Sequence, residues 1–101
     1  MLILLRTEAS IKIQFFIALL MSAAGFYFGI SATEWCIQLL AIGLVMGVEG
    51  VNTAIEKLSD YVQPKKDSAI GLIKDISAGA VMIVSVLASI VGLIIYVPKL
   101  L

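Results

Sequence analysis

The sequence predicts an all-α membrane protein with three transmembrane helices in a single domain, residues 1–101. Of the 101 residues, 61% are hydrophobic and only 14% are charged, whereas a soluble domain of this size has about half apolar and about a quarter charged residues. The uncharged residues fall into blocks, and a spanning helix needs about 20 mostly apolar residues. We therefore expect helices over 12–30, 33–60 and 74–97.

The first predicted helix, 12–30, is followed by the short turn "GISATEW". Ser31 and Glu34 have the spacing of a capping box, so the second helix should begin immediately. Tyr27 and Trp35 are residue types that favour the boundary between lipid and water. The start of the chain does not resemble a signal peptide, because no basic segment precedes the apolar block and no small-residue cleavage pattern ends it.

The second predicted helix, 33–60, is followed by the polar stretch "YVQPKKDSAIG". Pro64 in this stretch ends the helix or keeps it from continuing. We expect a polar loop up to the third helix, 74–97. All basic residues except Lys99 lie before the first helix or in and around this loop. The positive-inside rule therefore predicts a cytoplasmic N terminus and loop, with the C terminus outside.

The stretch "VEGVNTAIEKLSD" places polar side chains on one face of the second helix. At about 100° per residue, Asn52, Thr53, Glu56 and Asp60 all fall within about 60° of Glu49. We call these five residues the polar stripe.

The depth of the polar stripe follows from the rise of the helix. At about 1.5 Å per residue, Glu49 lies roughly 21 Å from Trp35, within a hydrocarbon core of about 30 Å and nearer its cytoplasmic side. Glu56 reaches the interface. Glu8, before the first helix, and Lys74–Asp75, which open the third, are expected at the same level.

The chemistry of this layer favours phosphoryl transfer at the membrane surface. A charge near the middle of a bilayer costs about 2.5–3.5 kcal/mol, so a submerged Glu49 is a functional candidate; a structural hydrogen bond between helices is the alternative. Desolvation would make its carboxylate a stronger base toward a hydroxyl. Carboxylates suit Mg²⁺ with substrate phosphates, and lysine can meet a phosphate. Lys65, Lys66 and Asp67 fit either phosphate contacts or a solvated loop, and Ala78 fits either packing or space for a substrate.

Other classes of site find no support in the composition. The formal net charge is zero, so no nucleic-acid partner is expected. The chain has no histidine, and the single Cys36 has no second cysteine for a zinc site or an internal disulfide. It also lacks GxxxxGK[ST] and GxGxxG motifs.

Several motifs together resemble the bacterial integral-membrane diacylglycerol kinase and undecaprenol kinase family. "E…NTAIE" followed by "KD" has the family's pattern, and "LLRTEA", "GFYFGIS…EW" and "GLIKDISAGAV" are similar to its other segments. The likeness covers nearly the whole chain. Members begin with an amphipathic surface helix, of which "MLILL" would be the end. The resemblance implies an Mg-ATP-dependent lipid kinase of the bacterial plasma membrane, with its active site on the cytoplasmic side.

The resemblance also implies residue roles. Glu49 would be the general base on the lipid hydroxyl, and Asn52 would orient it. Glu8 and Glu56 would bind the Mg²⁺ that bridges the phosphates of ATP. The nucleotide would contact Glu8, Glu56, Lys65, Lys66, Asp67, Lys74 and Asp75, and the lipid would contact Glu49, Ala78 and Trp35. The family is a homotrimer whose sites are shared between neighbouring protomers.

Two other functional classes stay open on the residues alone. One is a small oligomeric subunit of a proton or ion pathway that uses Glu49, and the other is a structural helper subunit. The crowding of carboxylates beside Lys74 favours the kinase, since conduction does not need it. Diacylglycerol and undecaprenol both present a hydroxyl on a long apolar body, so the choice of lipid also stays open.

Overall fold

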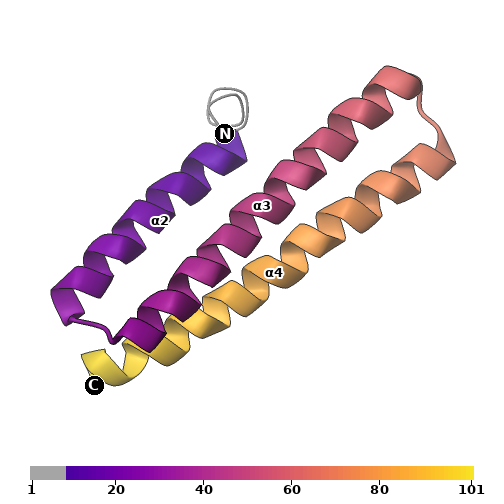
Figure 1. The fold of residues 1–101 in the computed structure, drawn as a ribbon. Coiled ribbons are helices and arrows are strands. Elements are labelled where there is room, and N and C mark those ends of the chain that lie inside the picture. Colours follow the sequence, from indigo (N-terminus) through magenta and orange to yellow (C-terminus); the bar gives the residue numbers. More distant parts are fainter. Residues whose placement is uncertain (1–8) are drawn as a thin grey trace.

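The computed structural model describes residues 9–101, which form three helices: α2 (Ala9–Phe28), α3 (Ala32–Val62) and α4 (Ser68–Leu100) (Figure 1). No strand occurs within the described residues. Each helix is long and apolar enough to cross a membrane. The predicted all-α class with three spanning helices is therefore confirmed.

The predicted boundary between the second and third helices was wrong. α4 begins at Ser68 rather than at residue 74, and only residues 63–67 connect it to α3. The cause is a cap: the Asp67 carboxylate accepts hydrogen bonds from the backbone N–H groups of Ala69 (2.8 Å) and Ile70 (3.2 Å). The polar residues Lys65, Lys66 and Asp67 directly before α4, followed by Ser68, made this boundary look like loop in the sequence. At its other end, α4 extends three residues beyond the predicted limit of 97, through Pro98.

The turn between α2 and α3 forms as predicted. The Ser31 Oγ accepts a hydrogen bond from the Glu34 N–H (3.1 Å), and the Glu34 carboxylate accepts one from the Ser31 N–H (2.9 Å). This is a complete capping box. Gly29, with φ of 60°, supplies the left-handed residue that ends α2. The chain therefore reverses direction within a few residues.

Polar contacts fix α3 and α4 in one antiparallel register over nearly their whole length. Lys99 pairs with Glu34 (2.9 Å) at one end, Tyr96 donates to Gln38 (2.5 Å) further along, and Lys74 pairs with Asp60 near the other end. All three pairs keep nearly the same offset between the two helices. Interpolation between them places Glu49 of α3 at the level of Ser85 of α4.

The closest packing between helices lies at the α2–α3 turn. A Cβ atom at Gly25 would sit 2.7 Å from the Trp35 side chain, so only glycine fits beneath this ring. Phe26 stacks on Trp35 with ring centroids 4.9 Å apart. Ile30 and Ile95 form the buried core beside them. The predicted boundary residue Trp35 is therefore also part of the packed turn.

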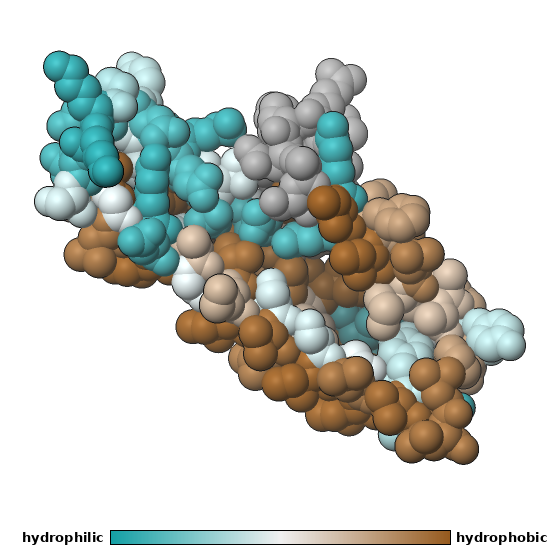
Figure 2. Space-filling view, turned by 180° about the vertical axis from the view of Figure 1, so that it is seen from behind, coloured by the Kyte–Doolittle hydropathy of each residue, from teal (hydrophilic) through white to brown (hydrophobic). Residues whose placement is uncertain are grey.

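Hydrophilic residues gather at the end of the molecule that carries the α3–α4 connection, and hydrophobic residues cover most of the opposite half (Figure 2). Large apolar side chains are exposed along all three helices. Such an outward apolar surface is what a bilayer requires of a spanning bundle. Residues 63–67 thus mark the polar end, and the α2–α3 turn marks the opposite end.

Candidate active site

The central residues of the polar stripe are buried. Glu49, Asn52 and Thr53 are only 8%, 7% and 5% exposed. On a bundle whose outer surface is apolar, this burial means that Glu49, Asn52 and Thr53 face the interior of the bundle, as the sequence predicts, whereas Glu56 is half-buried and Asp60 is exposed at the polar end. A carboxylate and an amide in such a place have a high cost of burial, which singles them out as functional candidates.

Asn52 and Glu56 form a polar pair one helical turn apart. The Asn52 Nδ2 donates a hydrogen bond to the Glu56 Oε1 (2.9 Å). The Asn52 Oδ1 is buried and has no hydrogen-bond partner among the described residues. A buried acceptor without a partner costs free energy, so a ligand or a cation that meets it is favoured. The pair therefore presents oxygen atoms from two side chains on one face of α3.

Lys74 brings a positive charge from α4 to the polar end of α3. Its ammonium group forms an ion pair with the Asp60 carboxylate, one turn beyond Glu56. Asp75, the next residue, is exposed. The structure thus places the predicted "KD" residues at the same end of the hairpin as Glu56, with Lys74 tied to the stripe itself.

The loop residues assigned to the nucleotide divide into two kinds. Lys65 and Lys66 are exposed in the connection between α3 and α4. Asp67 uses one carboxylate oxygen to cap α4. The capping role was missed in the sequence, although an aspartate directly before the helix-compatible run "SAIG" is a typical N-cap signal.

The remaining predicted residues lie apart from the stripe. Ala78 is exposed on α4, near the level of Glu56 in the antiparallel register. Trp35 packs at the α2–α3 turn, at the opposite end of α3 from the carboxylates. Glu8 lies outside the described residues. The structure therefore brings Glu56 and Lys74 toward the polar end of the bundle, places Glu49 and Asn52 nearer the middle of α3 on the same helix, and leaves Trp35 at the other end.

The side-chain oxygen atoms of the polar stripe are suitable ligands for a hard divalent cation, if substrate phosphates supply further ligands. Within residues 9–101 no group of three or more histidine, cysteine, aspartate or glutamate side chains could hold a metal alone. Mg²⁺, however, is usually bound by one or two carboxylates together with phosphate oxygens and water. The Glu56 carboxylate and the partnerless Asn52 Oδ1 satisfy that requirement.

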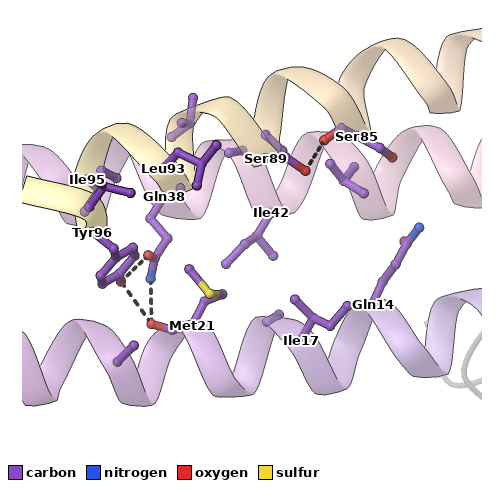
Figure 3. Close-up of a pocket in the computed structure, with 18 of the residues that line it drawn as sticks. Gln14, Ile17, Met21, Gln38, Ile42, Ser85, Ser89, Leu93, Ile95 and Tyr96 are labelled. Atoms are coloured by element: carbon purple, nitrogen blue, oxygen red, sulfur yellow. Dashed lines mark hydrogen bonds between the residues drawn. The ribbon is translucent and has the colours of Figure 1, made fainter. Parts of the chain in front are cut away.

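A cavity of about 630 Å³ lies between the three helices, directly beyond the stripe toward the α2–α3 turn (Figure 3). Where Tyr96 crosses the cavity, the Gln38 amide donates to the Met21 carbonyl oxygen (3.2 Å), and the Tyr96 hydroxyl lies 3.2 Å from the same oxygen. This cavity was not predicted from the sequence. The sequence pattern that could have indicated the cavity is a run of small residues at helical spacing on α4, namely Ser85, Ala88, Ser89 and Gly92.

Two comparisons with known proteins show which family the chain resembles. A family model described as "Prokaryotic diacylglycerol kinase" matches residues 1–96, a range that includes α2, α3 and most of α4. The undecaprenol kinase of Bacillus subtilis (strain 168) is 37% identical over 95 residues, which are 94% of this chain and 77% of the relative. No solved structure shows a significant match.

Proposed function

The chain belongs to the prokaryotic diacylglycerol kinase family, and from this premise we propose that it transfers the terminal phosphate of ATP to the hydroxyl of a membrane lipid alcohol. As a member of that family it is an integral membrane lipid kinase, which decides against the two non-enzymatic alternatives. Undecaprenol is the first candidate substrate, because the relative from Bacillus subtilis is named for it, and diacylglycerol is the second.

The observation that carries the proposed mechanism is the burial of Glu49 beside Asn52 on the inward face of α3. A lipid hydroxyl sits at the level where the apolar bundle meets its polar end, which is the level of Glu49. There the Glu49 carboxylate accepts the proton as the hydroxyl oxygen attacks the terminal phosphorus of ATP, the bond from that phosphorus to the bridging oxygen breaks, and ADP leaves. A positioned general base of this kind contributes about 10²–10⁴-fold to a rate.

The phosphate donor belongs at the polar end, beside Glu56 and Lys74. Lys74 contributes positive charge for phosphate oxygens, and its ion pair with Asp60 holds it against α3. Lys65 and Lys66, both exposed, add charge nearby. Asp67 contributes through the N-cap of α4 that holds this loop in place.

Mg²⁺ is the proposed metal, held by Glu56 and by Glu8. When bound, it would neutralise the negative charge that develops on the phosphates in phosphoryl transfer. Asn52 acts between the two functions, because its Nδ2 fixes the Glu56 carboxylate while its Oδ1 stays open toward a ligand. Asn52 thus orients the Glu56 metal ligand and keeps one oxygen atom for a ligand one helical turn from the Glu49 base.

The orientation in the plasma membrane and the assembly also belong to the proposal. The polar end with the lysines faces the cytoplasm, where ATP is present, in line with the positive-inside rule. We further propose a homotrimer with sites shared between protomers. The extensive exposed apolar surface of the described helices leaves ample area for such contacts.

Cysteine labelling tests the orientation. In a Cys36→Ala background, Ser68→Cys places a thiol at the exposed start of α4. We expect an impermeant maleimide to label it only after the cells are opened. Thr33→Cys, exposed at the α2–α3 turn, is the matched control and should be labelled in intact cells. Labelling of Ser68→Cys from outside would reverse the topology and deny the site access to ATP.

The activity itself is tested with radiolabelled ATP and each lipid in mixed micelles. We expect label in a phospholipid product with undecaprenol, less with diacylglycerol, and none with either after chelation of divalent cations. ATP consumption without any labelled lipid would contradict the proposal, and so would transfer that is insensitive to chelation.

A further inference from the structure

The inward face of α3 changes from polar to apolar just beyond Glu49. At about 100° per residue, Gln38, Ile42 and Val45 lie within about 40° of the direction of Glu49. All three line the 630 Å³ cavity. One face of α3 therefore presents the polar stripe toward the cytoplasmic end and an apolar slot immediately below it. The polar stripe followed by the apolar slot matches the polarity of a lipid alcohol, which has a hydroxyl head and a hydrocarbon tail.

Small residues on α4 keep this slot open. Ser85, Ala88, Ser89 and Gly92 lie on one face of α4 and line the cavity. The Ser89 hydroxyl donates to the Ser85 carbonyl (2.8 Å), so its polarity is satisfied within the helix. A Cβ atom at Gly92 would meet only the Met21 Cε, at 3.9 Å. A larger side chain at Gly92 would therefore enter the open slot rather than collide with the backbone.

Tyr96 crosses the slot where the run of small residues ends. Its hydroxyl donates to the Gln38 Oε1 of α3 (2.5 Å) and lies 3.2 Å from the Met21 carbonyl oxygen of α2, so that one side chain contacts both other helices (Figure 3). Between Ser85, at the level of Glu49, and Tyr96 the helix rises by about 16 Å. Phe28, Val97 and Leu100 line the cavity beyond Tyr96, so the slot continues past this side chain.

On the basis of the proposed function, we infer that Ala88 and Gly92 are specificity-determining residues, which admit the first part of the tail of the lipid alcohol to the slot below Glu49. Lipid tails are as apolar as the side chains of the slot, so burial by itself gives the tail no hydrophobic gain. Selectivity must then arise from steric fit, and substitutions that fill the slot should exclude tails according to their length.

The test is a graded filling of the slot at two depths. Ala88→Leu fills it about 6 Å nearer Glu49 than Gly92→Leu does. The substrates are geraniol, farnesol, geranylgeraniol and undecaprenol, in order of rising chain length. We expect Gly92→Leu to lower kcat/KM for the longest alcohols by about tenfold or more, the scale on which apolar pockets discriminate a methylene, and to leave the shortest within about twofold. Ala88→Leu should move the cut-off to a shorter chain.

Ala80→Leu is the matched control, because Ala80 is exposed on the opposite face of α4 and lines no part of the cavity. It should leave the whole series unchanged. Equal losses for every alcohol in Ala88→Leu and Gly92→Leu would mean that a second copy of the chain fills the slot, and would overturn the inference. Failure of the wild type to phosphorylate any alcohol would instead refute the proposed function.

Crosslinking to the wild-type protein tests the inference even if the substituted variants do not fold, because it needs neither a variant nor turnover. Undecaprenol with a photoactivatable group in its tail is crosslinked to the wild-type protein, and the modified residues are mapped by mass spectrometry. We expect label on the slot face of α4, around Ala88 and Gly92. Label confined to the outward face, around Ile83 and Leu87, which are both exposed, would place the tail in bulk lipid and overturn the inference.

Discussion

Glu49→Gln is expected to lower the rate of phosphoryl transfer by about 10²–10⁴-fold, the scale of a lost general base. The amide has nearly the shape of the carboxylate, so the variant should fold, insert and bind the nucleotide with Mg²⁺. The loss should therefore appear in kcat, with the Mg²⁺ requirement nearly unchanged. Single-turnover kinetics with undecaprenol in micelles measure this directly.

Glu34→Gln is the matched control for that substitution. Glu34 lies on the same helix, at the α2–α3 turn, and glutamine can still serve in a capping box. Its ion pair with Lys99 is lost, and an ion pair at the surface contributes little to stability. We expect the rate of Glu34→Gln to stay near that of the wild type. Retention of more than about half the wild-type rate in Glu49→Gln would show that Glu49 is not the base, by the estimate above.

Glu56→Gln is expected to raise the Mg²⁺ concentration for half-maximal activity by about 10–100-fold, a range seen even for residues that only support metal ligands. The substitution removes a charge and an oxygen donor, and it exchanges the acceptor of the Asn52 hydrogen bond for a group that is in part a donor. A titration of activity with Mg²⁺ at saturating ATP is the measurement. An unchanged requirement together with a reduced rate would move Glu56 out of the metal site.

Glu8→Gln should show the same change in the Mg²⁺ requirement if the two carboxylates share the cation. Mixed oligomers of the Glu8 and Glu56 variants then report on the proposed trimer. Restored activity would mean that complete sites form between protomers. No restoration in demonstrably mixed oligomers would assign both carboxylates to one protomer.

Hydrophobic blocks and one capping box predicted much of the fold. The three helices, the α2–α3 turn and the inward direction of the polar stripe all follow from periodicity and local capping, which are properties of neighbouring residues. The early start of α4 was missed because "KKDSAIG" is polar in composition, while its conformation is decided by one Asp67 carboxylate. Local chemistry of this kind outweighs average hydrophobicity at the boundary of a helix.

The candidate site was predictable where it lies on one helix and unpredictable where it depends on several. The spacing of Glu49, Asn52 and Glu56 places them on one face, and the structure confirms their proximity. The pairing of Lys74 with Asp60 and the cavity beyond Glu49 depend on the register between α3 and α4. No periodicity within one helix specifies that register, since it is set by contacts such as Tyr96 with Gln38.

The uneven distribution of contacts among the helices has a consequence for the order of assembly. Most of the contacts between helices in the described residues join α3 to α4, and far fewer join α2 to α3. In thermodynamic terms, the α3–α4 hairpin is the cooperative unit of highest local stability, and α2 is the element that opens at the lowest free energy. Membrane folding would then proceed by insertion of three independent helices, closure of the hairpin, and final docking of α2 through its Met21 carbonyl.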